Sequence, residues 1–398
     1  MKNDNVIIAG AGPVGMVAAL KLAKNGVRVT VLESGKVFPK DLRASTFHPP
    51  TLEMLDELGI TEELIEDGLV APYWQFRDRQ KGPIAIFDLS ILQDVTPFPF
   101  RVQIEQWQLV EKIHAKLLTM SNAEVLFEHQ VIGAREDSHG IKVLTWGPDG
   151  EKTLEGNILI AADGADSAVR KSLAIEFEGF TIPEKFWVIT TPFHFEDVME
   201  DLSEINYVSD PSEWLVLLRN KNYWRVLFPM YQDRTDEELM SDVAANAQLQ
   251  QLLKIDNGYD IMHKSIYRVH QRVAASYRIG NIFLAGDAAH INNPLGGMGM
   301  NGGIHDVWNL VDKILHRTEK NQNDLFNLYE KQRKTIAIEY VQKSTERNRK
   351  MLMATKQSDQ DQRNAEWLSI INDTVKTKEY LLESSMFNAL HRASEITL

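Results

Sequence analysis

Residues 5–33 read NVIIAGAGPVGMVAALKLAKNGVRVTVLE, and this stretch decides the fold. Residues 6–9 form a short, continuously apolar run that stops at glycines, which is typical of a buried parallel strand. A helical pattern follows over residues 16–24 and ends at Asn25-Gly26, a favourable left-handed cap. Residues 27–32 then indicate a second strand, so the stretch predicts one βαβ unit.

The glycines of this unit form the pattern GxGxxG in GAGPVG at residues 10–15, and Glu33 ends the second strand. Gly10 permits a tight turn, Gly12 lets a pyrophosphate approach the backbone, and Gly15 lets helix and strand pack closely. Free amides at the helix N-terminus face the phosphates, and Glu33 accepts hydrogen bonds from ribose hydroxyls. The pattern favours dinucleotide binding over a purely structural glycine turn, but it does not separate NAD from FAD.

Composition narrows the class of protein. A length of 398 residues with 43% hydrophobic and 25% charged residues is typical of a globular chain with about two or three folding units. The net charge of −13 has the wrong sign for binding a phosphate backbone, so we expect no nucleic-acid partner. No stretch reaches the roughly 20 apolar residues of a membrane span, and we expect neither a membrane partner nor a cleaved leader.

The chain contains no cysteine. This count excludes disulfides, thiolate metal sites and a cysteinyl bond to a cofactor. We therefore expect no metal, a non-covalent cofactor and a reducing, cytoplasmic location.

Three kinds of pattern follow the first unit. Helical periodicity covers residues 104–120 and, among charged residues, runs from 324 to about Met353. Aromatic-rich extended runs dominate residues 176–275 and predict a second, mostly antiparallel domain. The other expected elements are strands over 124–132, 140–146, 158–161, 214–219, 223–230 and 282–285, turns at 147–150 and 220–222, and a helix ending near 315.

We therefore expect an α/β (α+β) fold: a Rossmann-like dinucleotide-binding domain, an inserted mostly antiparallel β domain, and C-terminal helices. The first domain is expected to be discontinuous, over residues 1–75, 101–175 and 276–322. The inserted domain takes residues 76–100 and 176–275, and the helical section takes residues 323–398.

Two further motifs follow buried strands. ADGADSAVR occupies residues 162–170, and LAGDAAH at residues 284–290 is followed by Pro294 and the loop GMGMNG at 297–302. Together with the N-terminal glycines, in this order and spacing, they resemble the single-component (class A) FAD-dependent aromatic hydroxylases related to p-hydroxybenzoate hydroxylase. The resemblance covers roughly residues 4–345.

The resemblance implies a monooxygenase that uses FAD, NAD(P)H and O₂ to hydroxylate a small aromatic or heteroaromatic, anionic substrate through a C4a-hydroperoxyflavin. The inserted domain would then be the substrate domain. Two alternatives stay open: another flavoenzyme of the same fold, such as an epoxidase or a reductase, or a flavin-binding, redox-responsive protein without turnover. A homodimer is a further hypothesis.

The resemblance also assigns residues to the cofactor. It implies that Asp287 holds the ribityl chain, that Asp163 serves both FAD and the nicotinamide, and that Arg43 and Gln106 lie beside the flavin. Residues 294–301 would line the isoalloxazine, and the amides and helix N-terminus at residues 299–301 would stabilise the reduced flavin. The expected cofactor-binding residues are Gly10, Gly12, Pro13, Gly15, Glu33, Ser34, Arg43, Gln106, Asp163, Gly286, Asp287, Gly297, Gly299, Met300 and Asn301.

The sequence indicates the substrate residues less sharply. Arg225 puts a charge inside an apolar strand, so it needs a partner, either a substrate carboxylate or phenolate or, as the more favoured interpretation, a carboxylate of the protein. His48 either reaches the active site or only precedes a helix. The expected catalytic residues are Pro294, Arg225 and His48, and the expected substrate-binding residues are Arg225, Arg219, Tyr207 and Tyr223.

Overall fold

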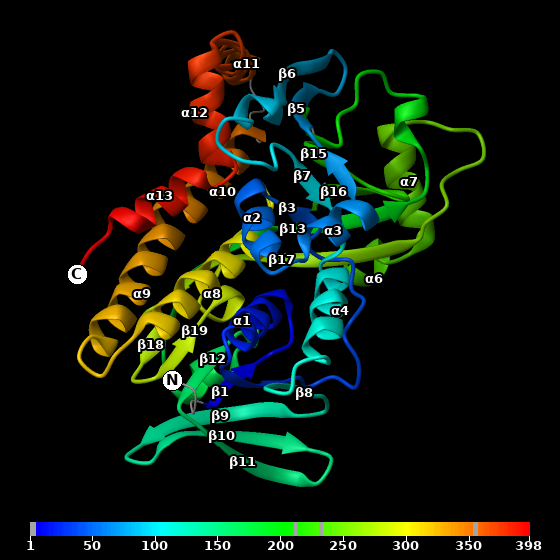
Figure 1. Ribbon diagram of the computed structural model, residues 1–398. Helices are drawn as coiled ribbons and strands as arrows, with labels where there is room; N and C mark the ends of the chain where they lie inside the picture. Colours follow the sequence, from blue (N-terminus) through cyan, green and yellow to red (C-terminus); the bar gives the residue numbers. More distant parts are fainter. Residues whose placement is uncertain (1–4, 211–212, 231–233, 353–356) are drawn as a thin grey trace.

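The computed structural model describes residues 5–210, 213–230, 234–352 and 357–398. Two main sheets lie in separate layers, with the segment that carries the glycine motif in the lower one (Figure 1). Helices at the C-terminal end of the chain run along one side of both layers (Figure 1). This arrangement is the α/β fold that the sequence predicts, and the functional residues lie where the two layers meet.

The lower sheet has six strands in the order β18-β19-β12-β1-β2-β8. Its strands are β1 (Asn5–Ala9), β2 (Arg28–Leu32), β8 (Ala123–Leu126), β12 (Ile158–Ala161), β18 (Arg278–Ile279) and β19 (Ile282–Leu284). All neighbours are parallel except β18 and β19, and Ile7 pairs with both Leu159 and Thr30. Because helices cover parallel sheets, the central strands are apolar on both faces.

Helices α1 (Pro13–Lys24), α4 (Gln106–Leu117) and α8 (Met298–His316) pack around this sheet. α1 contacts both α4 and α8. It begins at Pro13, three residues before the expected start, because proline suits the first helical position and Gly12 takes the cap. The shared apolar core therefore holds the glycine motif against the sheet.

The expected strand over residues 124–132 is two strands, β8 and β9 (Gln130–Asp137). Between them the chain turns at Glu128, whose φ is 57°. The turn is needed because β8 ends in the parallel sheet, whereas β9 belongs to an antiparallel sheet with β10 (Gly140–Gly147) and β11 (Gly150–Gly156). The expected helix end near Met353 lies outside the described residues.

The upper sheet has eight strands in the order β20-β17-β13-β16-β15-β14-β5-β6. Its strands are β5 (Tyr73–Asp78), β6 (Gly82–Asp88), β13 (Phe177–Thr191), β14 (Ile205–Ser209), β15 (Leu215–Asn220), β16 (Tyr223–Met230), β17 (His263–Ala274) and β20 (His290–Ile291). Every pair is antiparallel except β14 and β5. A small sheet of β3 (Thr46–Phe47), β7 (Arg101–Gln103) and β4 (Leu69–Ala71) joins the layers.

Side chains of the upper sheet alternate between two environments, as the pleat requires. Leu215 and Leu217 belong to an apolar cluster with α6 (Asp236–Leu239) and α7 (Asp242–Leu252) on one face. Val216 and Leu218 belong to the other face, which is turned toward the six-stranded layer and its cavity. The face of a residue on these strands therefore decides whether it can reach the site.

The C-terminal section is helical and covers one end of the upper sheet. It consists of α9 (Gln322–Ile336), a π-helical segment (Ala337–Gln342), α10 (Lys343–Leu352), α11 (Gln357–Ile371), α12 (Thr374–Ser384) and α13 (Phe387–Glu395). The ring of Trp367 stacks on Phe76 of β5 at 4.1 Å between centroids, and Tyr380 lies 5.0 Å from Phe87 of β6. The remaining helices are α2 (Pro49–Glu57), α3 (Thr61–Asp67) and α5 (Ala168–Ser172).

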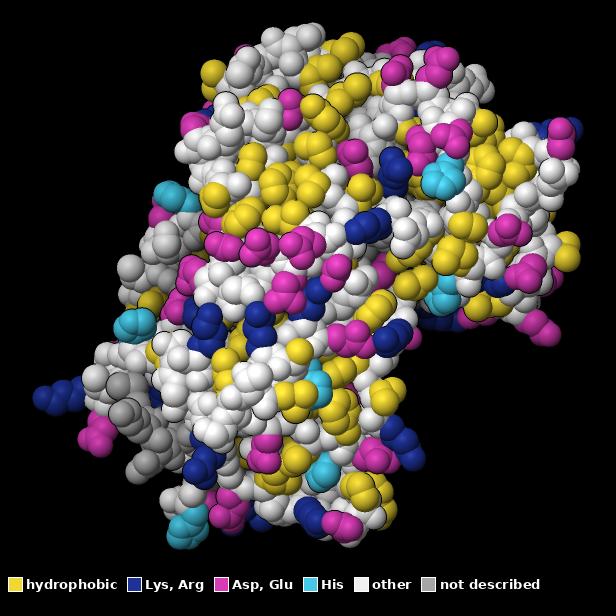
Figure 2. Space-filling view, turned by 45° about the vertical axis from the view of Figure 1, so that its right-hand side comes forward, with side chains coloured by type: hydrophobic (Ala, Val, Ile, Leu, Met, Phe, Trp, Pro, Cys, Tyr) yellow, Lys and Arg dark blue, Asp and Glu magenta, His cyan; other side chains and the backbone are white. Residues whose placement is uncertain are grey.

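The surface is mixed in charge. Figure 2 shows acidic and basic side chains interspersed over one face, with apolar side chains between them. Within the described ranges, no helix is both long enough and apolar enough to cross a membrane.

Candidate functional site

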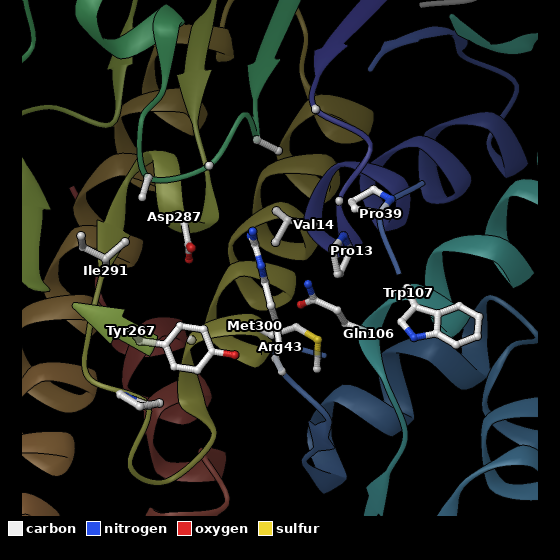
Figure 3. Close-up of a pocket in the computed structure, with 18 of the residues that line it drawn as sticks. Pro13, Val14, Pro39, Arg43, Gln106, Trp107, Tyr267, Asp287, Ile291 and Met300 are labelled. Carbon is white, nitrogen blue, oxygen red and sulfur yellow. The ribbon is translucent and has the colours of Figure 1, made fainter. Parts of the chain in front are cut away.

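A cavity of about 840 Å³ connects the two layers. It extends from the glycine motif, past the loop at residues 294–300, to the inner face of the upper sheet. In Figure 3, Arg43, Gln106, Tyr267, Asp287 and Met300 point into the same space from different parts of the chain. The cavity is therefore shared by the segments that the sequence assigned to cofactor and substrate.

The three glycines of the motif are required for different structural reasons. A Cβ at Gly10, whose φ is 96°, would collide with the Ala162 carbonyl, and one at Gly15 would collide with the Gly10 carbonyl. A Cβ at Gly12 would meet no protein atom within 4 Å, and Gly12 lines the cavity. Packing of the protein thus requires Gly10 and Gly15, whereas Gly12 leaves room for a ligand.

Glu33 lies beside this motif at the end of β2. Its Oε2 accepts a hydrogen bond from the Ala11 amide at 3.1 Å, and its Oε1 accepts from the Gly35 amide at 2.8 Å and the Ser34 hydroxyl at 3.3 Å. A carboxylate has about four acceptor positions, so it can also accept from a ligand hydroxyl. These bonds hold the carboxylate at the wall of the cavity.

Two aspartates follow the strands β12 and β19. Asp163 Oδ2 accepts from the Val169 amide at 3.2 Å, while its buried Oδ1 has no partner in the described part of the chain. Asp287 points into the cavity (Figure 3). Desolvation by the surrounding protein raises the pKa of both carboxyls, and for Asp287 the charges of His290 and Arg43 oppose that rise. Because Asp163 Oδ1 is unpartnered and both residues line the cavity, both carboxyls can accept hydrogen bonds from ligand hydroxyls.

A buried ionic network supports the segment that carries Asp287. Asp306 Oδ2 contacts the Gly286 amide at 3.0 Å and His290 Nε2 at 2.7 Å, and Asp306 Oδ1 accepts from Arg333 Nε at 2.6 Å. Burial raises the pKa of Asp306, but the charges and hydrogen bonds of His290 and Arg333 outweigh it and hold that pKa below the usual range. The network fixes the turn at residues 286–290 from behind.

The glycine loop ends in a left-handed turn that starts α8. Gly296 has a φ of 108° and Gly297 one of 67°, a conformation that favours glycine. Gly299 and Met300, in the first turn of the helix, line the cavity, so amides without intrahelical partners face it. These amides and the helix dipole suit negative charge in the ligand.

Asn301 and His48 hold this loop from the side away from the cavity. Asn301 Nδ2 donates to the Thr46 carbonyl at 2.9 Å and the Gly297 carbonyl at 2.7 Å, and its Oδ1 accepts from the His48 amide at 3.0 Å. His48 Nε2 lies 2.9 Å from the Gly296 carbonyl oxygen. Burial, with the charge of Arg101, holds the pKa of His48 well below its usual range.

The inner face of the upper sheet forms an apolar chamber. Its apolar wall residues are Val188, Ile205, Val216, Leu218, Leu227, Val269 and Leu295. Arg225 lies at its edge, where its guanidinium donates to the carbonyl oxygens of Leu42 and Arg43 and lies 3.6 Å from Glu105 Oε1. Burial raises the pKa of Glu105, although Arg225 and the hydroxyl of Tyr223 act against that rise.

Comparisons with known proteins agree with this geometry. A family model described as FAD binding domain matches residues 3–344. The para-nitrophenol 4-monooxygenase of Pseudomonas sp. (strain WBC-3) is 32% identical over 321 residues, which is 78% of each chain. The 6-hydroxy-3-succinoylpyridine 3-monooxygenase HspB of Pseudomonas putida is 29% identical, over 85% of this chain and 86% of that one.

A solved structure extends the likeness to nearly the whole chain. The crystal structure of p-nitrophenol 4-monooxygenase PnpA from Pseudomonas putida DLL-E4 has a TM-score of 0.90 and 29% identity, and covers 97% of this chain and 98% of that one. The chain belongs to the single-component FAD-dependent aromatic hydroxylases. The resemblance that its sequence motifs indicated is thereby confirmed, and the protein is a flavin-dependent monooxygenase that uses FAD and NAD(P)H.

The residues of this monooxygenase fit FAD. The open space at Gly12, the Glu33 carboxylate at the motif and the unpartnered Asp163 Oδ1 all lie along the cavity. Of the expected cofactor residues, those that line the cavity are Gly10, Gly12, Pro13, Glu33, Ser34, Arg43, Gln106, Asp163, Asp287, Gly297, Gly299 and Met300. Gly15, Gly286 and Asn301 lie behind the wall and support it.

Several expected substrate or catalytic residues do not line the cavity. Arg219 lies on the opposite face of the upper sheet, because it alternates with Leu218, and its Nη2 pairs with Glu196 at 2.8 Å. The hydroxyl of Tyr223 donates to Glu105 at 2.5 Å. His48 supports the loop from behind, so the structure favours the helix-preceding interpretation over the catalytic one. Pro294, Tyr207 and Arg225 do line the cavity.

Sequence reasoning missed several residues of the monooxygenase site. Arg101, Trp107 and Tyr267 line the cavity, and Glu105 and the pair Asp306–Arg333 hold its walls. Glu105 and Trp107 left a signal, since they flank the flavin-contacting candidate Gln106 in sequence. Arg101 and Tyr267 lie on strands and Asp306 and Arg333 on helices, and sequence patterns carry no information on how these elements contact one another.

Proposed function

We propose that this monooxygenase hydroxylates a small phenol or hydroxylated heteroaromatic ring. The observation that carries the proposal is the single cavity in which the FAD segments open into the apolar chamber of the upper sheet. A chamber with these walls favours a flat apolar ring over a long or strongly polar substrate. The names of the two relatives, which act on para-nitrophenol and on 6-hydroxy-3-succinoylpyridine, are consistent with such a ring.

FAD, when bound, supplies hydride acceptance and the activation of O₂. The chain's own residues bind and orient. Glu33 and the helix α1 would hold the adenosine and pyrophosphate end, and Asp287 would hold the ribityl hydroxyls. The amides in the first turn of α8 would stabilise negative charge on the reduced flavin, with Arg43 and Gln106 beside it.

The apolar chamber of the upper sheet would exclude water from the substrate. Pro294 and Leu295 form the side of the chamber next to the glycine loop, and strands β14 to β17 form the opposite side. We assign residues 76–100 and 176–275 to this substrate domain, and the segments 1–75, 101–175 and 276–322 to the FAD domain. Burial of the ring in this chamber would keep water away from the reacting atoms.

The test is substrate-dependent turnover. Purified protein is expected to release intact FAD on denaturation and to oxidise NADH or NADPH much faster with para-nitrophenol or a related phenol than without it, because substrate gates flavin reduction. Labelled O₂ should place one oxygen atom in the aromatic product, read by mass spectrometry. Rapid NAD(P)H oxidation that no phenol or pyridinol changes would contradict the proposal.

We further infer that the protein works in the cytoplasm, where reduced nicotinamide is available and a chain without cysteine needs no oxidising compartment. A homodimer stays a prediction, which light scattering at several protein concentrations tests.

A further inference from the structure

Arg101, on the small strand β7, is a buried cation that the FAD site does not use. Its exposed fraction is 3%, and it lines the cavity. Across the described residues, its guanidinium makes no ion pair or hydrogen bond, and its buried Nε has no partner. Its one contact of note is with the ring of Trp74, 5.3 Å from the centroid.

Among the residues that the structure describes, no carboxylate compensates the charge of Arg101. Burial lowers the pKa of the guanidinium, and the other groups that act on that pKa are the hydroxyls of Tyr207 and Tyr380, not carboxylates. The neighbouring His48 is neutral because its own pKa is held low. A buried charge without a partner is costly, so proteins keep one only where something else compensates it.

The other three arginines of the cavity differ in this respect, because Arg268 is exposed to solvent and the other two have partners. Arg225 has two backbone carbonyls and Glu105, and Arg43 pairs with Asp41 at 3.1 Å in an exposed position. Of Arg43, Arg101 and Arg225, only Arg101 lacks an acceptor among the described residues. Tyr207, which is also buried and also lines the chamber, stands beside it as a second donor.

We propose that Arg101, with Tyr207, is the subsite for an anionic oxygen substituent of the aromatic substrate. This inference rests on the proposed function and adds the polarity of the substrate: its ring lies against the apolar walls and its anionic oxygen faces Arg101. A phenolate and a carboxylate share this chemistry, and a guanidinium with a neighbouring hydroxyl can serve either.

The experiment measures binding to the FAD-containing protein, without NAD(P)H, by calorimetry. Three probes share the nitrobenzene ring: 4-nitrophenol, which forms a phenolate, 4-nitrobenzoate, which carries a carboxylate, and 4-nitroanisole, the neutral methyl ether. The variants are Arg101→Met, which keeps apolar volume without charge, and Arg101→Lys, which keeps the charge. Arg219→Met is the matched control, because it removes a cation from the opposite face of the upper sheet.

We expect Arg101→Met to weaken binding of the preferred anionic probe by about 30-fold or more, as loss of one partner of a buried charge pair does. Binding of 4-nitroanisole should change by less than about threefold, and Arg219→Met should leave all three probes unchanged. Arg101→Lys should retain part of the affinity. Preference of the native protein for 4-nitrophenol or for 4-nitrobenzoate identifies the anion, and either preference supports the subsite.

The thermal stability of Arg101→Met is a second readout. If Arg101 only supported the fold, its replacement would lower the Tm. Because ligand-free Arg101 is an unpaired buried charge, the Tm of Arg101→Met without ligand should equal or exceed that of the native protein. A marked fall in Tm, equal losses for 4-nitrophenol and 4-nitroanisole, or no binding of either anionic probe by the native protein would overturn the inference.

The anion subsite and the hydroxylase activity can be tested independently of each other. Tight, Arg101-dependent binding of an anionic probe without oxygen transfer to any phenol would leave the subsite and remove the proposed function. Oxygen transfer that Arg101→Met leaves unchanged in KM and kcat, with unchanged binding, would leave the function and remove the subsite.

Discussion

Arg225 on β16 holds the backbone of Arg43, because its guanidinium donates a hydrogen bond to the Arg43 carbonyl oxygen. The same guanidinium donates to the Leu42 carbonyl, which also accepts from the Tyr267 hydroxyl at 3.0 Å. The segment that carries the Arg43 side chain into the cavity is thus fastened to the upper sheet. A change in those strands is transmitted to the position of Arg43.

Arg225→Met should loosen this connection. Two buried carbonyls lose charged donors and the buried Glu105 loses its cation, so we expect a loss of about 3 to 5 kcal/mol in the free energy of unfolding. FAD affinity should fall as well, because Arg43 is no longer held at the cavity. Denaturant unfolding and FAD titration on the same variant measure the two effects.

Tyr267→Phe is the milder control for Arg225→Met. It removes one neutral hydrogen bond to Leu42 and should cost about 0.5 to 1.5 kcal/mol, with Arg225 still in place. If Arg225→Met were as stable as the native protein, the hydrogen bonds of Arg225 to the two carbonyls would contribute nothing to the free energy of unfolding.

Alanine substitutions, which add one methyl group each, can distinguish the roles of the glycines in the first motif. In Gly12→Ala the new Cβ meets no protein atom, so the apoprotein should lose no more than about 1 kcal/mol, the cost of a poorer helix cap. FAD affinity should drop by about tenfold or more, because the methyl group occupies ligand space. FAD titration and thermal unfolding of the apoprotein measure both quantities.

Gly15→Ala should give the reverse result. Its Cβ collides with the Gly10 carbonyl, so the variant should be strongly destabilised with or without FAD. An unstable Gly12→Ala apoprotein, or a Gly12→Ala variant with native FAD affinity, would show that this glycine does not face the cofactor.

Buried histidines should make the protein sensitive to acid. Burial, followed by the charge of Arg333, lowers the pKa of His305 to about 3 from the usual 6.5. Between these values the unfolded chain binds a proton that the folded chain excludes, so stability falls as pH drops below about 6.5. The slope contributed by one such histidine is about 1.4 kcal/mol per pH unit. Denaturant unfolding from pH 7 to pH 5 measures it.

His305→Gln should lower that slope by about the contribution of one histidine. It removes the titrating ring and leaves an amide that can still bond to Thr51, the native partner of His305 Nε2 at 3.0 Å. The exposed His139 provides the control, and His139→Asn should leave the slope unchanged. An equal slope in His305→Gln and in the native protein would contradict the assignment.

The buried pair of Asp306 and Arg333 should behave as a unit. Arg333→Met strands the Asp306 carboxylate and should cost about 3 to 5 kcal/mol. Asp306→Asn strands the guanidinium and should cost a similar amount. The double variant should be more stable than the sum of the two losses predicts, by more than about 0.5 kcal/mol, in a cycle measured by denaturant unfolding.

The end of the cavity formed by the glycine motif could be predicted because its sequence signals are local. Strand, glycines, helix and Glu33 follow each other within residues 5–33, and backbone geometry alone gives each glycine its task. The end formed by the upper sheet could not, because the face of a strand residue depends on register with its neighbours. Arg219 and Arg225 look alike in sequence, yet they lie on opposite faces of the sheet.

Contacts between side chains that lie far apart in the sequence could not be predicted either. Nothing near Arg101 in sequence indicates that it lacks an anion, since that depends on Trp74, Tyr207 and Tyr380 from three other elements. Asp306 and Arg333 lie on different helices, and their contact follows from how α8 and α9 pack.

The pairing of β12 between β1 and β19 has a consequence for biosynthesis. One edge of β12 can pair with β1 as soon as residue 161 has left the ribosome, but the other must await Leu284, about 120 residues later. At typical elongation rates this interval is roughly 6 to 25 s. During that time an apolar strand edge stays open, so the nascent chain depends on rapid completion, or on a chaperone, to avoid pairing with other chains.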